Sequence, residues 1–159
     1  MRLRYLCLVL TWLVATPAWA AGFEDPYGPE ESASWGVDLA TGIGRTWGSG
    51  GILVRHEDVI ADFAWWTQRA GVLWLDTIRF DQTAVADVAV GLRVFFTSYH
   101  RGPFLLTELG WIQGIGPRFR GSAKATVGTG VRIRDLSAEV QFAISDGDNL
   151  ALGALGWTF

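Results

Sequence analysis

Three side chains of this sequence are of the types that assemble a hydrolytic site. His56 and Asp58 stand two residues apart, and Ser145 lies far along the chain. A serine hydroxyl becomes a nucleophile when a histidine accepts its proton and a carboxylate orients that histidine. Ser145, His56 and Asp58 are therefore candidate catalytic residues. The alternative is that His56 and Asp58 belong to a polar rim that faces water.

Other kinds of catalytic or binding chemistry are not indicated. The only cysteine, Cys7, lies within the first 20 residues, so the rest of the chain has no disulfide and no thiol chemistry. No metal-ligand spacing and no phosphate-binding loop occurs. The glycines of Gly42–Gly44 and Gly128–Gly130 fall in strand-like segments, where glycine permits close packing. We therefore expect no cofactor and no metal.

The first 20 residues have the pattern of a signal peptide for export by the Sec route. Met1–Arg4 is basic, Tyr5–Val14 is apolar, and Ala18–Ala20 offers small residues at a cleavage position. Residues 21–33 are acidic and contain two prolines, which predicts a flexible arm. A single domain is expected over 34–159.

The net charge of the chain beyond residue 20 argues against nucleic acid as a partner. Residues 1–20 hold two of the 13 basic and none of the 16 acidic residues, so the chain beyond them has a net charge of −5. Lys124 is its only lysine. A protein that binds nucleic acid has a basic patch, which this composition does not supply.

The rest of the chain alternates apolar and polar residues with a period of two, which predicts β-strands. No stretch approaches the ~20 consecutive apolar residues of a membrane-spanning helix, whereas a tilted strand crosses a bilayer in roughly 9–11 residues. The third strand alternates poorly, and a bulge near Asp76 would restore it. The pattern predicts a closed eight-stranded antiparallel transmembrane β-barrel with a polar lumen and short connections. The expected strands are 34–45, 51–66, 71–80, 85–99, 103–113, 122–134, 136–145 and 149–159.

The orientation of the two strand faces follows from the aromatic residues. A soluble barrel turns its aliphatic face inward, whereas a membrane barrel turns it toward lipid. Aromatic residues gather at the predicted strand ends, which is typical of the girdles that flank a bilayer-spanning band. They are Trp35, Trp65, Trp66, Tyr99, Phe104, Trp157 and Phe159 at one end and Trp47, Phe80 and Trp111 at the other. The residues expected to face lipid include Val90, Val94, Val127, Val131, Val140 and Phe142.

Charged residues on the opposite face are expected to form ion pairs in the lumen. A tight turn at His100–Arg101 would place Arg93 opposite Glu108, and a turn at Asp135–Leu136 would place Arg132 opposite Glu139. Opposite charges across a strand pair stabilise a sheet, and buried charges need partners. These four residues are predicted to form a structural ion network. The alternative is a narrow, gated path for ions or protons.

The C-terminal strand ends on Trp157 and a terminal aromatic, Phe159. In this the chain resembles the small eight-stranded outer-membrane proteins of bacteria, whose last strand closes the barrel against the first. The resemblance implies a location in the bacterial outer membrane, with Trp157 and Phe159 as the closing terminus. It also implies contact with lipid and lipopolysaccharide, transient binding to the barrel-assembly machinery, and a monomer.

One part of the chain resembles a more specific family. The segments Gly102–Gly110, Val127–Ile133 and Ile144–Asp146 are similar to the second half of the lipid A 3-O-deacylases, barrel enzymes that remove an acyl chain from lipopolysaccharide. Their site has a His-x-Ser pair, then Asn and a later acidic residue. The alignment puts Ser145 at the serine, Ala143 at the histidine and Asp146 at the asparagine, with no Glu afterwards. Without the histidine, no base activates the hydroxyl.

Two functions therefore remain open. The first is a non-enzymatic outer-membrane barrel that contributes to envelope structure or surface interaction. The second is a diverged lipid A deacylase-like hydrolase that acts on lipopolysaccharide acyl chains. A small pore is a third possibility, although eight strands leave an interior only wide enough for its own side chains. Arg118 and Arg120, in an expected outer loop, are candidates for contact with lipopolysaccharide phosphates.

Overall fold

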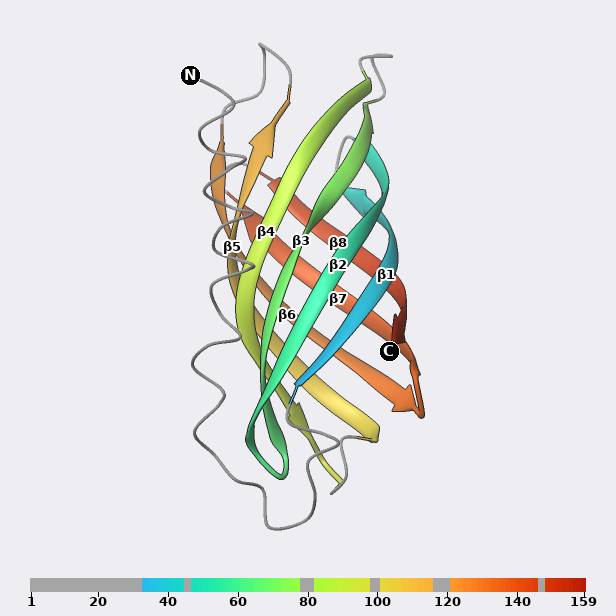
Figure 1. The fold of residues 1–159 in the computed structure, drawn as a ribbon. Helices are drawn as coiled ribbons and strands as arrows, with labels where there is room; N and C mark the ends of the chain where they lie inside the picture. The colour runs from blue at the N-terminus through green and yellow to red at the C-terminus, as the bar shows by residue number, and fades with distance from the viewer. Residues whose placement is uncertain (1–32, 45–46, 78–81, 98–100, 116–120, 146–147) are drawn as a thin grey trace.

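The computed structural model contains eight antiparallel strands that close into a barrel (Figure 1), as the sequence predicts. It describes residues 33–44, 47–77, 82–97, 101–115, 121–145 and 148–159. The strands are β1 (Ala33–Gly44), β2 (Trp47–Ala61), β3 (Ala64–Thr77), β4 (Gln82–Phe95), β5 (Gly102–Gly114), β6 (Ser122–Ile133), β7 (Leu136–Ser145) and β8 (Asp148–Thr158). Among the described residues no helix is long and apolar enough to cross a membrane. The expected signal peptide and almost all of the arm lie outside the described residues.

The pairing register gives the tilt of the strands. Hydrogen-bonded partners can be followed once around the barrel through Ser34, Glu57, Thr67, Gly91, Glu108, Thr126, Ala143, Leu150 and Gly44. The path returns to β1 at Gly44, ten residues beyond its start at Ser34. With ~3.3 Å per residue and ~4.8 Å between strands, this shear corresponds to a tilt of about 40°. The resulting interior is narrow and is filled by side chains.

The barrel has two distinct ends. The terminal end holds Ala33 and Phe159, the turns Asp62–Phe63 and Arg134–Asp135, and the β4–β5 connection. The distal end lies at the opposite ends of the same strands. Backbone hydrogen bonds of 3.3 and 2.8 Å join Trp35 to Phe159, so the last residue of the chain helps to close the barrel.

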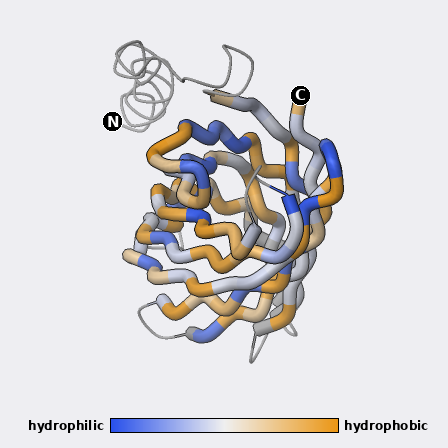
Figure 2. Tube along the Cα trace, turned by 90° about the horizontal axis from the view of Figure 1, so that it is seen from below, coloured by the Kyte–Doolittle hydropathy of each residue, from blue (hydrophilic) through white to orange (hydrophobic). Residues whose placement is uncertain are grey.

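The outer face is apolar and the inner face carries the charges, because side chains of a strand alternate between two faces. Val140 and Phe142 on β7 are 65% and 44% exposed, whereas Glu139 and Gln141 between them are buried. Val127 and Val131 are also exposed, and Val90 and Val94 are partly exposed. Figure 2 shows this alternation of hydrophobic and hydrophilic residues along the closed wall. The predicted orientation of the aliphatic face is confirmed.

The boundary between β2 and β3 differs from the prediction. The expected strand 51–66 is interrupted by a turn at Asp62–Phe63, which contains neither the glycine nor the proline that marks many turns. Trp65 and Trp66 therefore belong to β3. The β3–β4 register runs unbroken to Asp76, so the expected bulge there is wrong, and the irregularity lies between Val59 and Ala61 on β2.

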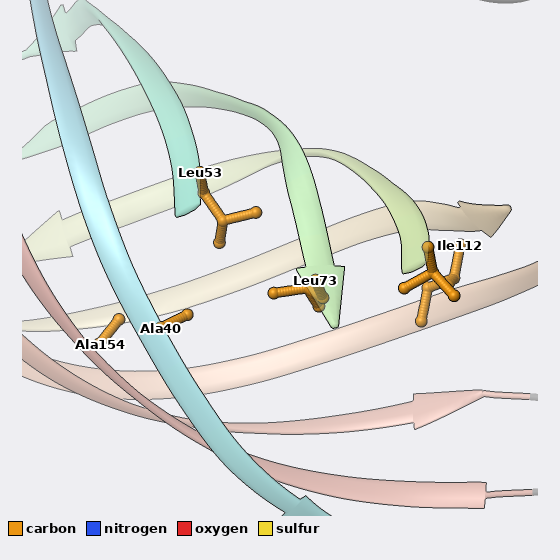
Figure 3. Close-up of a cluster of buried hydrophobic side chains, with 6 residues drawn as sticks. Ala40, Leu53, Leu73, Ile112 and Ala154 are labelled. Carbon is orange, nitrogen blue, oxygen red and sulfur yellow. The ribbon is translucent and has the colours of Figure 1, made fainter. Parts of the chain in front are cut away.

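Apolar side chains fill the lumen on both sides of a charged middle layer. Trp65, Phe95, Phe104 and Leu106 form a buried cluster at the terminal end. A second cluster lies toward the distal end and consists of Ala40, Leu53, Leu73, Val85, Ile112 and Ala154 (Figure 3). A third, neighbouring cluster on β7 and β8 contains Ala143, Leu150 and Leu152.

Candidate functional site

The charged layer of the lumen is the most elaborate polar arrangement in the described part of the chain. Glu57 of β2 is one centre of it. Its Oε1 lies 2.6 Å from Arg93 Nη1 and 3.3 Å from Arg55 Nε, and its Oε2 accepts a hydrogen bond from Arg132. Arg55 also donates to Asp38 Oδ1 at 2.5 Å and to Thr158 Oγ1 at 2.9 Å. One carboxylate thus holds arginines from three strands.

Glu139 of β7 is the second centre of this ion network. It accepts hydrogen bonds of 2.7 Å each from Arg69 Nη1 and Arg93 Nη2. Arg69 also donates to Glu108 and, at 2.8 Å, to Gln141 Oε1. Because Arg93 contacts both Glu57 and Glu139, the two centres form one connected network. With Thr158 included, every strand of the barrel contributes a side chain.

The ion network is balanced in charge. It contains four arginines (Arg55, Arg69, Arg93 and Arg132) and four carboxylates (Asp38, Glu57, Glu108 and Glu139). All eight are buried. An unpaired ion in such an environment costs several kcal/mol, so each charge requires a nearby opposite charge. The arrangement meets that requirement with no net formal charge in the lumen.

A separate ion pair lies on the distal side of the network. Lys124 Nζ is 2.5 Å from Asp87 Oδ2, and both side chains are buried. Lys124 pairs across β6 and β7 with Ser145, the last residue of β7. This pair adds one cation and one anion to the lumen, so the charge balance is unchanged.

Aromatic rings close the terminal side of the network. The Arg93 guanidinium lies 4.3 Å from the centroid of the Phe104 ring, and the Arg132 guanidinium lies 5.3 Å from that of Phe95. Aromatic faces attract cations, and the attraction is stronger where water is excluded. The rings therefore hold the two arginines in place while filling the end of the lumen.

The ion pairs in the structure differ from those that the sequence predicts. Arg93, Glu108, Arg132 and Glu139 are all buried and paired, but Arg93 lies opposite Leu106, and Arg132 lies opposite Ser137. The residues directly opposite Glu108 and Glu139 are Gly91 and Gly130. The Arg93–Glu108 and Arg132–Glu139 pairs are therefore wrong.

The physical reason is the position of the turns and the narrowness of the lumen. Ile133 pairs with Leu136, so the turn lies at Arg134–Asp135, one residue earlier than expected. A register shift of two residues leaves every side chain on its original face, because the side-chain period is two. Glu108 and Glu139 then lie opposite glycine, and the four side chains reach across the lumen to strands that are not their neighbours.

Four members of the network were not among the predicted lumen pairs: Asp38, Arg55, Glu57 and Arg69. A signal for Arg55 and Glu57 was available in the sequence, because they fall on the strand face opposite to that of the apolar Ile52 and Val54. Arg69 lay between the predicted second and third strands, so it could not be assigned to a face. Its recognition required the true position of the β2–β3 turn.

The candidate hydrolytic residues do not come together. His56 Nδ1 lies 3.4 Å from Asp58 Oδ2. His56 pairs with Trp35, which in turn is hydrogen-bonded to Phe159, so it lies toward the terminal end. Ser145 ends β7 at the distal end. Because the strands between them run the length of the barrel, the set Ser145, His56 and Asp58 is not assembled.

The predicted aromatic girdle at the terminal end divides between two faces. Trp35, Trp157 and Phe159 are exposed on the outer face, and Trp66 is partly exposed. Trp65 and Phe104 instead point into the lumen and are buried, so their assignment to the girdle is wrong. Alternation explains this, because Trp65 and Trp66 are adjacent and must face opposite sides.

Several candidates cannot be placed. Arg118, Arg120, His100, Tyr99 and Phe80 lie outside the described residues, as does Asp146. Within the described ranges, no three His, Cys, Asp or Glu side chains are grouped so that they could hold a metal ion.

Comparisons with known proteins give a fold. No family model matches the sequence, and no curated protein matches it. A de novo designed transmembrane β-barrel is similar in structure, with a TM-score of 0.59 and 10% sequence identity over 79% of this chain and 95% of that one. The N-terminal β-barrel domain of Pseudomonas aeruginosa OprF is also similar, with a TM-score of 0.51 and 11% identity over 79% of this chain and 97% of that one. The chain therefore has the closed eight-stranded antiparallel fold of transmembrane barrels.

Proposed function

We propose that this chain is a small β-barrel protein of the bacterial outer membrane with a non-enzymatic role in envelope structure or surface interaction. The observation that carries the proposal is the inverted polarity of the barrel. Large apolar side chains, among them Leu109, Ile133, Val140 and Leu155, are exposed on the wall, while a balanced ion network occupies the middle of the interior. Lipid stabilises this arrangement, and water does not.

The proposal includes the route to the membrane and the partners there. The signal-like residues 1–20 support export by the Sec route. The terminal residue Phe159, which is hydrogen-bonded to β1, supports insertion by the barrel-assembly machinery. Lipid and lipopolysaccharide would then surround the wall. The connected, filled lumen favours a rigid scaffold over a channel.

The test is a charge placed on the proposed lipid face. Val140 is 65% exposed near the middle of β7. A Val140→Arg substitution should destabilise a barrel embedded in a membrane by roughly 2–4 kcal/mol, because arginine at mid-bilayer on the lipid face costs that much. In a soluble barrel the same exposed position should tolerate arginine within about 0.5 kcal/mol. The measurement is the heat-modifiable, faster-migrating folded band of full-length protein in isolated outer membranes.

The matched control is Asp135→Arg, in the exposed turn between β6 and β7. The proposal requires Asp135→Arg to assemble at the wild-type level while Val140→Arg does so poorly. Recovery of the wild-type protein in the soluble fraction, or equal assembly of the two variants, would overturn it.

The hydrolase alternative has a separate readout. Ser145 and His56 lie toward opposite ends of the barrel, so the imidazole cannot accept the proton of the serine hydroxyl. Overproduction of the protein should therefore leave the acyl-chain number of lipid A unchanged in mass spectra. Loss of one ester-linked chain, abolished by Ser145→Ala, would favour the hydrolase.

A further inference from the structure

One charged side chain departs from the apolar character of the outer wall. Asp58 on β2 alternates with Glu57, which points into the lumen, so its own side chain faces outward. Among strand residues whose side chains the structure describes, it is the only Asp, Glu, Lys or Arg on the outward face. The carboxylate keeps 16% of its side-chain surface exposed. A carboxylate beside lipid is costly unless a cation is near, so this position calls for a partner.

The wall around Asp58 is polar and aromatic. Its neighbours on the outward face are His56 on the same strand and Gln68 of β3, which pairs with His56. These two side chains are only 2% and 4% exposed. His56 Nδ1, Gln68 Oε1 and Asp58 Oδ1 have no hydrogen-bond partner among the described residues. Among the described residues, the group beside the carboxylate that could neutralise it is therefore the His56 imidazole, 3.4 Å away and charged only when protonated, and no arginine or lysine is paired with it.

Two indole rings flank the carboxylate. Trp66 lies directly opposite Asp58 across the β2–β3 pair. Trp35 pairs with His56, and its ring lies 4.5 Å from the imidazole at an angle of 53°, which places it diagonally beside Asp58. Trp35 is 37% exposed and Trp66 is partly exposed. A carboxylate flanked by two indole side chains suits an organic ammonium group, because both the charge and the ring quadrupoles attract cations.

The position of Asp58 along the barrel axis indicates which molecule supplies that cation. Trp35 is joined to Phe159 by backbone hydrogen bonds, so Asp58 lies at the level of the aromatic residues of the terminal end. Tryptophan is enriched where the hydrocarbon core meets the lipid head groups. We propose that Asp58, Trp35 and Trp66 bind the ammonium head group of a zwitterionic phospholipid in the leaflet at the terminal end of the barrel. This inference rests on the proposed membrane location.

The experiment measures lipid selectivity. Full-length protein, extracted from membranes in mild detergent, is placed in nanodiscs that contain equal amounts of phosphatidylethanolamine and phosphatidylglycerol. Lipids that remain bound are counted by native mass spectrometry. Wild-type protein should retain phosphatidylethanolamine over phosphatidylglycerol by about three- to tenfold, as expected for a cation held by a carboxylate and aromatic rings. Asp58→Asn should bring this ratio close to one.

Two further variants make the result specific. Asp62→Asn removes a carboxylate from the exposed turn four residues away and should retain the wild-type ratio. Trp66→Leu removes one ring, keeps the charge, and should lower the ratio in part. A wild-type ratio near one, or equal ratios in the wild-type and Asp58→Asn proteins, would overturn the head-group site.

The two proposals fail in different ways. If folded, heat-modifiable protein is recovered from membranes but has no lipid preference, the head-group site is wrong and the membrane location stands. If the wild-type protein is soluble, the proposed function is wrong and the head-group site falls with it. Should Asp58→Asn fail to fold, the ratio for Trp66→Leu against that for Asp62→Asn decides the question.

Discussion

At the scale of single residues, Glu57 and Glu139 organise the lumen. Each forms ion pairs with arginines from more than one strand, and Arg93 contacts both carboxylates. Such shared ions are coupled, so the loss of one carboxylate affects several arginines at once. This coupling distinguishes a connected network from a set of independent cross-strand pairs.

Glu139→Ala should lower the free energy of unfolding by about 3 kcal/mol, at the lower end of the range for breaking a buried pair. The loss is limited because Arg69 retains Glu108 and Arg93 retains Glu57. Urea titration of protein in lipid vesicles measures it. A double-mutant cycle should show clear coupling between Arg93 and Glu139 and much weaker coupling between Arg93 and Glu108. The reverse order would contradict the network.

At the scale of the strands, small residues make room for the ions. A Cβ added at Gly156 on β8 would lie 2.2 Å from Asp38 Oδ1 and 2.6 Å from Ser137 Oγ. A Cβ added at Gly153 on the same strand would meet no atom closer than 4.0 Å. The two glycines therefore have different structural roles, although both interrupt the same apolar strand.

Gly156→Ala should destabilise the barrel by about 1–3 kcal/mol, the usual cost of overpacking. Gly153→Ala is the matched control and should be neutral or slightly stabilising, since alanine loses less conformational entropy than glycine on folding. Equilibrium unfolding of both variants checks the difference. Equal effects at the two positions would mean that Gly156 does not pack against the Asp38 carboxylate.

The β6–β7 turn makes a separate prediction at this scale. Arg134 has a φ of 56°, in the left-handed region that costs a non-glycine residue about 1–2 kcal/mol. Arg134→Gly should therefore raise the unfolding free energy by up to about 1 kcal/mol, after the greater entropy of glycine in the unfolded chain is subtracted. Asp135→Gly has no such strain to relieve and should be destabilising. The opposite ranking in unfolding experiments would place the turn elsewhere.

At the scale of the whole molecule, the lumen is a filled interior. Trp65, Phe95 and Phe104 pack at the terminal end, the ion network lies in the middle, and aliphatic side chains pack toward the distal end. Ions that enter such an interior would have to displace packed side chains as well as paired charges. Eight strands leave an interior only wide enough for its own side chains.

We therefore expect no steady single-channel conductance from the folded protein in planar bilayers. A Trp65→Ala, Phe104→Ala double variant tests whether the terminal cluster alone excludes ions. It should also remain closed, because the arginines and carboxylates behind the rings still fill the barrel. Uniform conductance steps from the wild-type protein would contradict a closed lumen and favour a pore.

The sequence by itself determined the fold class, the number of strands and which faces are apolar. These properties follow from the two-residue period, which is a local feature of each strand. The orientation of Val127, Val140 and Glu139 could be predicted for this reason. The predicted strand 51–66 shows where the two-residue period fails. The turn inside it contains no glycine or proline, so the alternation looks continuous, and Arg69 could not be assigned to a strand face.

Only the tertiary structure decided which charges meet. A shift of two residues in register preserves every face and changes every partner, so alternation cannot choose between Arg93–Glu108 and Arg93–Glu139. Closure of the barrel decides it, because closure brings β4 and β7 side chains together across a narrow lumen. The arrangement of the strands in the closed barrel also places Ser145 and His56 toward opposite ends. Faces are fixed by local geometry, whereas partners depend on turn positions and on the shear of the closed sheet.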